Sequence, residues 1–163
     1  MAGPNSPTDL VSELTVPDWA TLALVGSGLL ALGSVQPWIT LTVSENLATA
    51  IGVPPRETAG GLGGDGLTSL FFALLVVAVV LFSAARSSTG PGRGTAGLCL
   101  FSGLAVGFVA YAVYADARAT RDRYARVDVE ATIALDVHAS LFVIVLGALV
   151  LASSGAIGLV REW

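Results

Sequence analysis

The residues best suited to chemistry lie in the polar connections of an otherwise apolar chain. His138 is the only histidine and follows Asp136 by two residues. An imidazole can bind a metal or titrate near neutral pH, but positions two apart do not share a helix face. A metal would need further ligands from Asp65, Asp128 or Glu130. We therefore interpret His138 as an interfacial residue with a hydrogen-bonded partner, and expect no catalytic residue, metal or cofactor.

The connection 116–136 is the most charged part of the chain. Its arginines alternate with carboxylates, in the order Asp116, Arg118, Arg121, Asp122, Arg123, Arg126, Asp128 and Glu130. Arg118 and Arg121 suit contacts with lipid headgroups or an acidic partner, and a solvated, self-neutralised face is the alternative. Asp122 stands four residues before Arg126, which favours a helix that continues to about Arg126.

Four long apolar stretches surround these connections. About 20 apolar residues cross the hydrocarbon of a bilayer as a helix, and 54% of the chain is hydrophobic, with a mean hydropathy of +0.79. The pattern predicts an all-α membrane protein with an antiparallel four-helix transmembrane bundle. We expect an N-terminal tail at 1–18, either with an interfacial helix at 8–16 or without structure, and one membrane domain at 19–163. The expected spans are 19–38, 67–85, 95–115 and 137–160.

Small residues recur within the spans at spacings that favour close helix packing. Where lipid removes the hydrophobic drive between helices, glycine and alanine let backbones approach each other. The candidate packing positions are Gly26, Gly33, Gly103, Gly107, Gly147, Ala148 and Ala152. The span centres hold serines and essentially no ionisable residue, which argues against a proton-coupled carrier or a monomeric ion channel.

Two segments between the spans have strand character. Ile39–Val43 alternates β-branched residues and is predicted to be a strand, and Val127–Ile133 is a second candidate. They would pair if both connections lie on the same side of the membrane, as part of a small extracellular loop cap. Trp38 is expected to mark the membrane interface. Asp65 closes a glycine-rich loop and is expected to stabilise its turn or cap the next span.

Arginine counting gives a partial orientation. The connection between the second and third spans carries Arg86 and Arg93 without acids, and Arg161 lies near the C-terminus. The positive-inside rule then places both termini in the cytoplasm, although the arginines of 116–136 count the other way. We favour a multi-pass cell-membrane protein with cytoplasmic termini, because the longer connections are easier to explain as an exposed cap.

The first half of the chain carries a recurring pattern. Gln36-Pro37-Trp38-Ile39-Thr40 leaves the first span, and Gly64-Asp65-Gly66 opens the second. This arrangement resembles a group of uncharacterised small four-span membrane proteins of archaea and actinobacteria, which implies four spans and a structured first loop but no activity. The layout is also similar to claudin-like and tetraspanin-like topology. That similarity is one of layout only, because their extracellular cysteine pairs are missing and Cys99 is the only cysteine.

The leading functional hypothesis is a non-enzymatic structural or accessory protein. It would act through helix packing and extracellular-loop contacts, with the lipid bilayer, other membrane-protein subunits or itself as partners, and without nucleic acid. The first alternative is a small transporter or channel formed by an oligomer, with serine and glycine faces lining the pore. The second is an interfacial lipid-binding protein or enzyme, in which one cavity would gather Asp65, Arg118, Arg121, Asp136 and His138.

Overall fold

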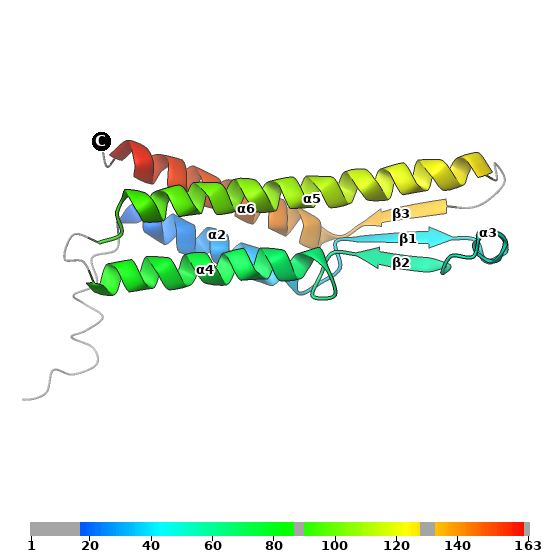
Figure 1. The fold of residues 1–163 in the computed structure, drawn as a ribbon, viewed down its shortest axis with the longest axis horizontal. Coiled ribbons are helices and arrows are strands. Elements are labelled where there is room, and N and C mark those ends of the chain that lie inside the picture. Colours follow the sequence, from blue (N-terminus) through cyan, green and yellow to red (C-terminus); the bar gives the residue numbers. More distant parts are fainter. Residues whose placement is uncertain (1–16, 87–89, 128–132, 162–163) are drawn as a thin grey trace, which may run out of the picture.

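The fold consists of four long helices side by side and a small sheet that extends from one end of them (Figure 1). The computed structural model describes residues 17–86, 90–127 and 133–161. The elements are α2 (Asp18–Ser34), β1 (Ile39–Val43), α3 (Glu45–Ile51), β2 (Arg56–Ala59), α4 (Asp65–Arg86), α5 (Arg93–Val127), β3 (Ile133–Val137) and α6 (Ala139–Arg161). The expected interfacial helix at 8–16 lies outside the described residues.

Three helices are long and apolar enough to cross a membrane, namely α4, α5 and α6. The fourth, α2, has 17 residues, which gives about 26 Å against a hydrocarbon thickness of about 30 Å. The predicted span 19–38 is therefore wrong at its end, because the helix stops at Ser34. Pro37 disfavours helical geometry in the residue before it. The last predicted span begins too early, since Val137 belongs to β3.

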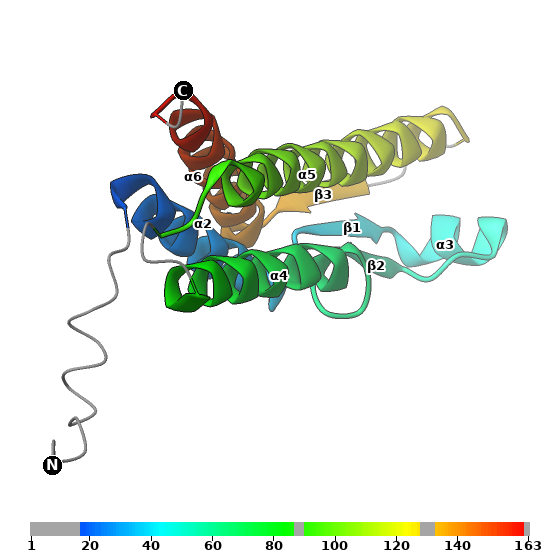
Figure 2. The ribbon, with the colours of Figure 1, turned by 60° about the vertical axis from the view of Figure 1, so that its left-hand side comes forward.

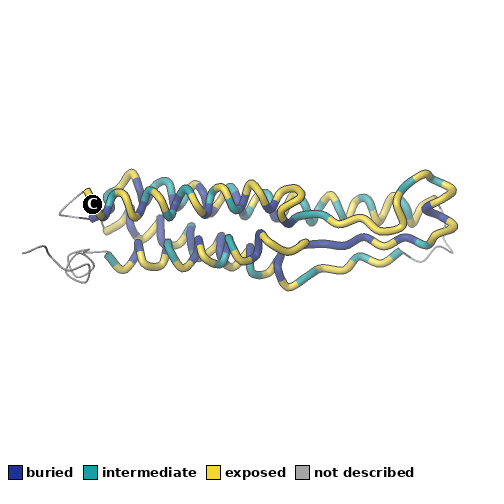
Figure 3. The backbone as a smooth tube through the Cα atoms, turned by 90° about the horizontal axis from the view of Figure 1, so that it is seen from below, coloured by how far each residue is buried: buried dark blue, intermediate teal, exposed yellow. Residues whose placement is uncertain are grey.

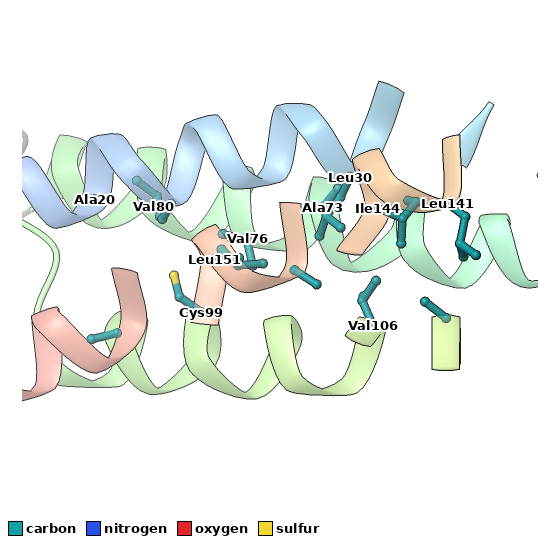
Figure 4. Packing of buried hydrophobic residues seen from close by; sticks show 14 of the residues in the cluster. Ala20, Leu30, Ala73, Val76, Val80, Cys99, Val106, Leu141, Ile144 and Leu151 are labelled. Atoms are coloured by element: carbon teal, nitrogen blue, oxygen red, sulfur yellow. The ribbon is translucent and has the colours of Figure 1, made fainter. Parts of the chain in front are cut away.

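Each long helix packs against two neighbours. Helices α4 and α6 both contact α2, and both contact α5. The enclosed core is made of aliphatic side chains such as Val76, Val106, Ile144 and Leu151, all fully buried (Figure 4). The outward face is also apolar, and its large exposed residues include Phe71, Phe101, Phe108, Phe142 and Leu149. Helices that are apolar on their outward face suit a lipid surrounding.

Helix α6 approaches α2 at backbone distance. A Cβ atom placed on Gly26 would lie 2.9 Å from the amide nitrogen of Leu151, and one on Gly147 would lie 3.0 Å from that of Leu30. Near the other end, a Cβ on Gly33 would lie 3.1 Å from the carbonyl oxygen of Ser140. Side chains larger than hydrogen at these positions would force the two helices apart.

The contact between α5 and α6 is equally close. A Cβ on Gly103 would lie 2.5 Å from the amide nitrogen of Ala152 and 2.6 Å from the carbonyl oxygen of Ala148. Gly107, one turn further on, has only the Cβ of Ala148 nearby, at 3.9 Å. Gly103 and Gly107 look equivalent from their spacing in the sequence. In the structure, Gly103 is a tight packing position, whereas Gly107 has ordinary van der Waals distances.

The sheet has the order β2-β1-β3, with both pairs antiparallel. Ile39, Leu41 and Val43 are buried on the side that faces α5, and β1 is the most buried strand (Figure 3). The prediction of a strand at Ile39–Val43 is confirmed, whereas its predicted pairing with Val127–Ile133 holds only at Ile133, which is opposite Val43. The second strand is displaced, because Val127 is helical and the strand occupies Ile133–Val137. Residues 128–132 lie outside the described part.

Helix α5 is longer than any membrane crossing requires. Its 35 residues correspond to about 52 Å, so it runs through the bundle and then along the sheet (Figure 2). This confirms the predicted continuation to about Arg126. The ion pair found within the described residues joins Arg161 to Asp18, at 3.6 Å, so the spacing of Asp122 and Arg126 is not used for an ion pair.

The two glycines of α5 provide a matched test of the packing. We expect Gly103→Ala to lower the free energy of unfolding by about 1–3 kcal/mol, because overpacking displaces α6. Gly107→Ala, at a position with ordinary contact distance, should change it little or raise it slightly, because alanine favours helix over glycine. Unfolding of both variants in mild detergent measures the difference. Equal effects would show that backbone contact at Gly103 does not limit the α5–α6 distance.

Candidate functional site

The polar part of the molecule is a compact unit at one end of the bundle, which we call the outer head (residues 39–64, 116–127 and 133–137). It contains the three strands, α3 and the distal part of α5. The chain passes directly from α2 into β1 and from β3 into α6 (Figure 1). The residues at this junction and the surface of the head are the candidate site.

Trp38 holds the junction together. Its side chain is fully buried, and its indole Nε1–H donates to the carbonyl oxygen of Gly33 at 3.0 Å. Its backbone amide donates to the carbonyl of Ala59, and its own carbonyl accepts from the amide of His138, both at 2.9 Å. The indole is enclosed by protein, and Trp38 connects helix α2 with β2 and with the residue that follows β3. The expectation that Trp38 marks the membrane interface stays a prediction.

The glycine-rich loop after β2 covers this tryptophan. Gly60 has a φ of +80°, and a Cβ at this position would overlap the indole ring of Trp38. Gly61, with a φ of +74°, packs against the backbone of Gln36 and Pro37. A positive φ favours glycine, so both the conformation and the space require it here. Gly60 and Gly61 thus serve packing and turn formation.

His138 has the hydrogen-bonded partner that the sequence predicted. Its Nε2 lies 2.8 Å from the hydroxyl oxygen of Thr40, which is itself 2% exposed. Asp136 is opposite Thr40 in the β1–β3 register and is exposed. Within the described residues, no group of three or more His, Cys, Asp or Glu side chains is arranged to hold a metal ion. The imidazole of His138 thus links the end of β3 to β1 at the junction, through its contact with the buried Thr40.

A cleft of about 120 Å³ lies on the other face of the sheet. Its apolar floor comes from β1, β2 and α5, and polar residues from β2, α4 and α5 line its sides. The lining residues are Ile39, Leu41, Ala59, Val113 and Ala117 for the apolar part, and Glu57, Asp65, Asp116 and Thr120 for the polar part. The cleft therefore combines hydrocarbon with three carboxylates from three separate elements.

The five residues proposed for a single cavity are not brought together. Of these five, Asp65 alone lines the cleft, next to Ile39 and Leu41. His138 contacts Thr40, whose side chain points to the opposite face of β1 because side chains alternate along a strand. Arg118 and Arg121 are exposed and lie outside the cleft lining. One chain alone does not assemble these groups into one centre.

Asp65 takes a different role from the expected cap. It is the first residue of α4, where a carboxylate is favoured by the helix dipole. Its side chain makes no ion pair or hydrogen bond with the described residues. It remains exposed on the rim of the cleft.

Three buried serines of the helices bond to the backbone of their own helix. The hydroxyls of Ser27 and Ser34 donate to carbonyl oxygens four residues earlier, and Ser154 donates to one three residues earlier. All three are buried within the bundle. Ser102 is also fully buried, and its hydroxyl has no partner among the described residues. These serines therefore do not form a polar seam on the outside of the bundle.

Several residues of the site escaped the sequence analysis. Glu57 and Asp116 reach the cleft only through the β1–β2 register and the placement of α5, which single-sequence periodicity does not provide. Thr40 was recognised only as part of a strand. Gly60 carried the one usable signal, because a Gly-Gly pair just after a strand indicates a turn with positive φ.

Comparisons of the chain with known proteins give no match. No protein-family model matches it, and neither a curated protein nor a solved structure matches it. The resemblance to small four-span membrane proteins therefore stays a prediction, and the function has to be argued from the fold and the outer head.

The Gly60–Trp38 contact predicts a sharp sensitivity at one glycine. Gly60→Ala should lower the free energy of unfolding by at least about 1–3 kcal/mol, since a Cβ in this backbone region is strained and also meets the indole. Gly63→Ala is the matched control, because open space surrounds a Cβ at that position. Thermal unfolding followed by tryptophan fluorescence compares the two. Similar melting temperatures for both variants would contradict the packing role of Gly60.

The hydrogen bond between Thr40 and His138 gives a second prediction. Thr40→Val keeps the shape and removes the hydroxyl, so unfolding should become easier by about 0.5–1.5 kcal/mol. Thr42→Val, at an exposed position on the same face of β1, is the control. The histidine ring signals in NMR spectra should shift in the first variant and not in the second. An unchanged imidazole spectrum in Thr40→Val would contradict this bond.

Proposed function

We propose that this chain is a non-enzymatic integral membrane protein that presents the outer head to a protein partner. Its four long helices form an antiparallel transmembrane bundle in this proposal. The partner is another membrane-protein subunit or a second copy of the chain. The bundle supplies the anchor and the outer head supplies the recognition surface.

The observation that carries the proposal is the continuity of α5. This helix crosses the bundle and continues beside β1 and β3 without a break. Tyr124 in its distal part packs on the cluster of Leu41, Val43 and Leu47 in the head. A head fixed to its anchor in this way presents its surface at a constant height and orientation, which lowers the entropic cost of binding.

Helix α2 is included as the fourth span because of its neighbours. It is shorter than the others, yet it lies along α6 with backbone contacts at Gly26, Gly33 and Gly147. If α6 crosses the bilayer, α2 must lie at the same depth. Its outward residues Leu22 and Leu32 are apolar and exposed. Local thinning of the bilayer accommodates a deficit of a few ångströms at modest cost.

The proposed orientation places the outer head outside the cell. The opposite end of the bundle carries the end of α4, the start of α5 and the end of α6, with Arg86, Arg93 and Arg161. Basic residues near span ends favour the cytoplasmic side. Both ends of the chain would then be cytoplasmic.

The surfaces that remain available to a partner are not the glycine and alanine helix faces that the sequence suggested. Gly26, Gly33, Gly103, Gly147, Ala148 and Ala152 pack within the chain. A partner would therefore meet the outer head and the large apolar side chains that face away from the bundle. The local hydrogen bonds of the buried serines give no support to a pore between copies.

Site-specific photo-cross-linking in native membranes tests this proposal. A photoreactive residue at Thr42 or Thr58, both exposed on the outer head, should give adducts with a protein of defined mass. The same residue at Phe101, which is 62% exposed on the bundle, is the matched control and should react mainly with lipid. Purified chain in liposomes should show neither solute flux nor turnover. Absence of protein adducts at every head position would contradict the proposed recognition role.

A further inference from the structure

The cleft in the outer head has carboxylates without partners. Glu57, Asp65 and Asp116 line it, are exposed, and make no ion pair with any described residue. Between them lies an apolar floor that includes the buried side chains of Ile39 and Leu41. An acidic rim around hydrocarbon complements a side chain with an aliphatic stem and a cationic end, which describes arginine.

The same helix carries such side chains on its other flank. Asp116 and Arg118 are two positions apart, so their directions differ by about 200° around the helix axis. Arg121 follows three residues later and shares the flank of Arg118. Both arginines are exposed and have no ion-pair partner in the described part of the chain. Arg118 therefore points away from the cleft of its own chain.

We propose that Arg118 and Arg121 of one copy dock into the acidic cleft of a second copy. Charge complementarity supports this occupant, because the cleft is lined by acids and the flank presents two guanidinium groups. The inference rests on the proposed membrane function. Copies in one bilayer share an orientation, so a lateral contact joins only groups at the same height. The cleft residues 113–120 and the two arginines belong to the same stretch of α5 and meet this condition.

The proposed contact joins two different surfaces of the chain. Each copy donates one flank and accepts another at its cleft, which makes the interface heterologous. Such interfaces generate closed rings or open rows, depending on the rotation between neighbours. In the membrane plane this rotation is about the bilayer normal, so the expected assembly is a ring or a row of heads.

A charge swap tests the proposal in full-length protein reconstituted in liposomes. One variant carries Arg118→Glu and Arg121→Glu, and the other carries Glu57→Arg and Asp116→Arg. Energy transfer between donor-labelled and acceptor-labelled copies reports association. Each variant alone should associate more than about tenfold more weakly than the unmodified protein, because like charges then face each other. Mixed together, the two variants should regain association, since each flank again meets a cleft of opposite charge.

The mixture separates a lost contact from a damaged fold, because misfolded variants would not recover on mixing. Arg86→Glu, at the far end of α4, makes the same charge change away from the head and should leave transfer unaltered. Association of the unmodified protein should also weaken at high ionic strength. No association of the unmodified protein, unaltered association of either variant alone, or no recovery in the mixture would overturn the proposal. Head adducts of a different polypeptide would in that case leave the proposed recognition function intact.

Discussion

The close approach of α6 to its two neighbours is the constraint on which the rest of the structure depends. Lipid offers helices no hydrophobic reason to associate, so contact has to come from packing, and packing at backbone distance requires glycine. Gly147 of α6 allows this close contact with α2, and Gly103 of α5 allows the close contact with α6. These contacts fix the distance between the end of α2 and the start of α6. Because β1 and β3 continue from those two points, the spacing of the helices also sets the pairing of the strands above them.

The junction is the place where the chain passes from the apolar bundle into the polar head. Backbone groups that leave a helix need new hydrogen-bond partners, because a buried polar group without one is costly. Trp38 meets this need from three sides, through its indole, its amide and its carbonyl. The hydroxyl of Ser140 donates to the carbonyl of Pro37 at 2.6 Å and adds a further bond between the two chain passages. The head is therefore joined to the bundle by hydrogen bonds and close packing.

Much of this architecture was predictable because it follows from solvent and periodicity. The apolar stretches predicted three helices that are long enough to cross a membrane, and the alternation of Ile39–Val43 predicted the central strand. The charged continuation predicted the length of α5. The features that the sequence did not predict depend on the register between strands and on the rotation of each helix about its axis. Glu57 enters the cleft because it pairs with Leu41, and Gly103 differs from Gly107 because of how α5 is turned toward α6. Trp38 fits the pattern of an interfacial anchor equally well, and only the fold around Gly60 explains its burial.

The connections between the helices and the strands are too short to act as flexible linkers. Four residues separate α2 from β1, and one residue separates β3 from α6. A rotation of α2 against α6 within the bundle would therefore act as shear along the β1–β3 ladder, with no flexible linker to absorb it. A tilt of the long helix α5 would produce a large displacement at its distal end, because that end lies far from the centre of the bundle. A change in the packing of the bundle would therefore distort the sheet of the outer head. Conversely, a force applied to the head would be transmitted to the helices that it joins.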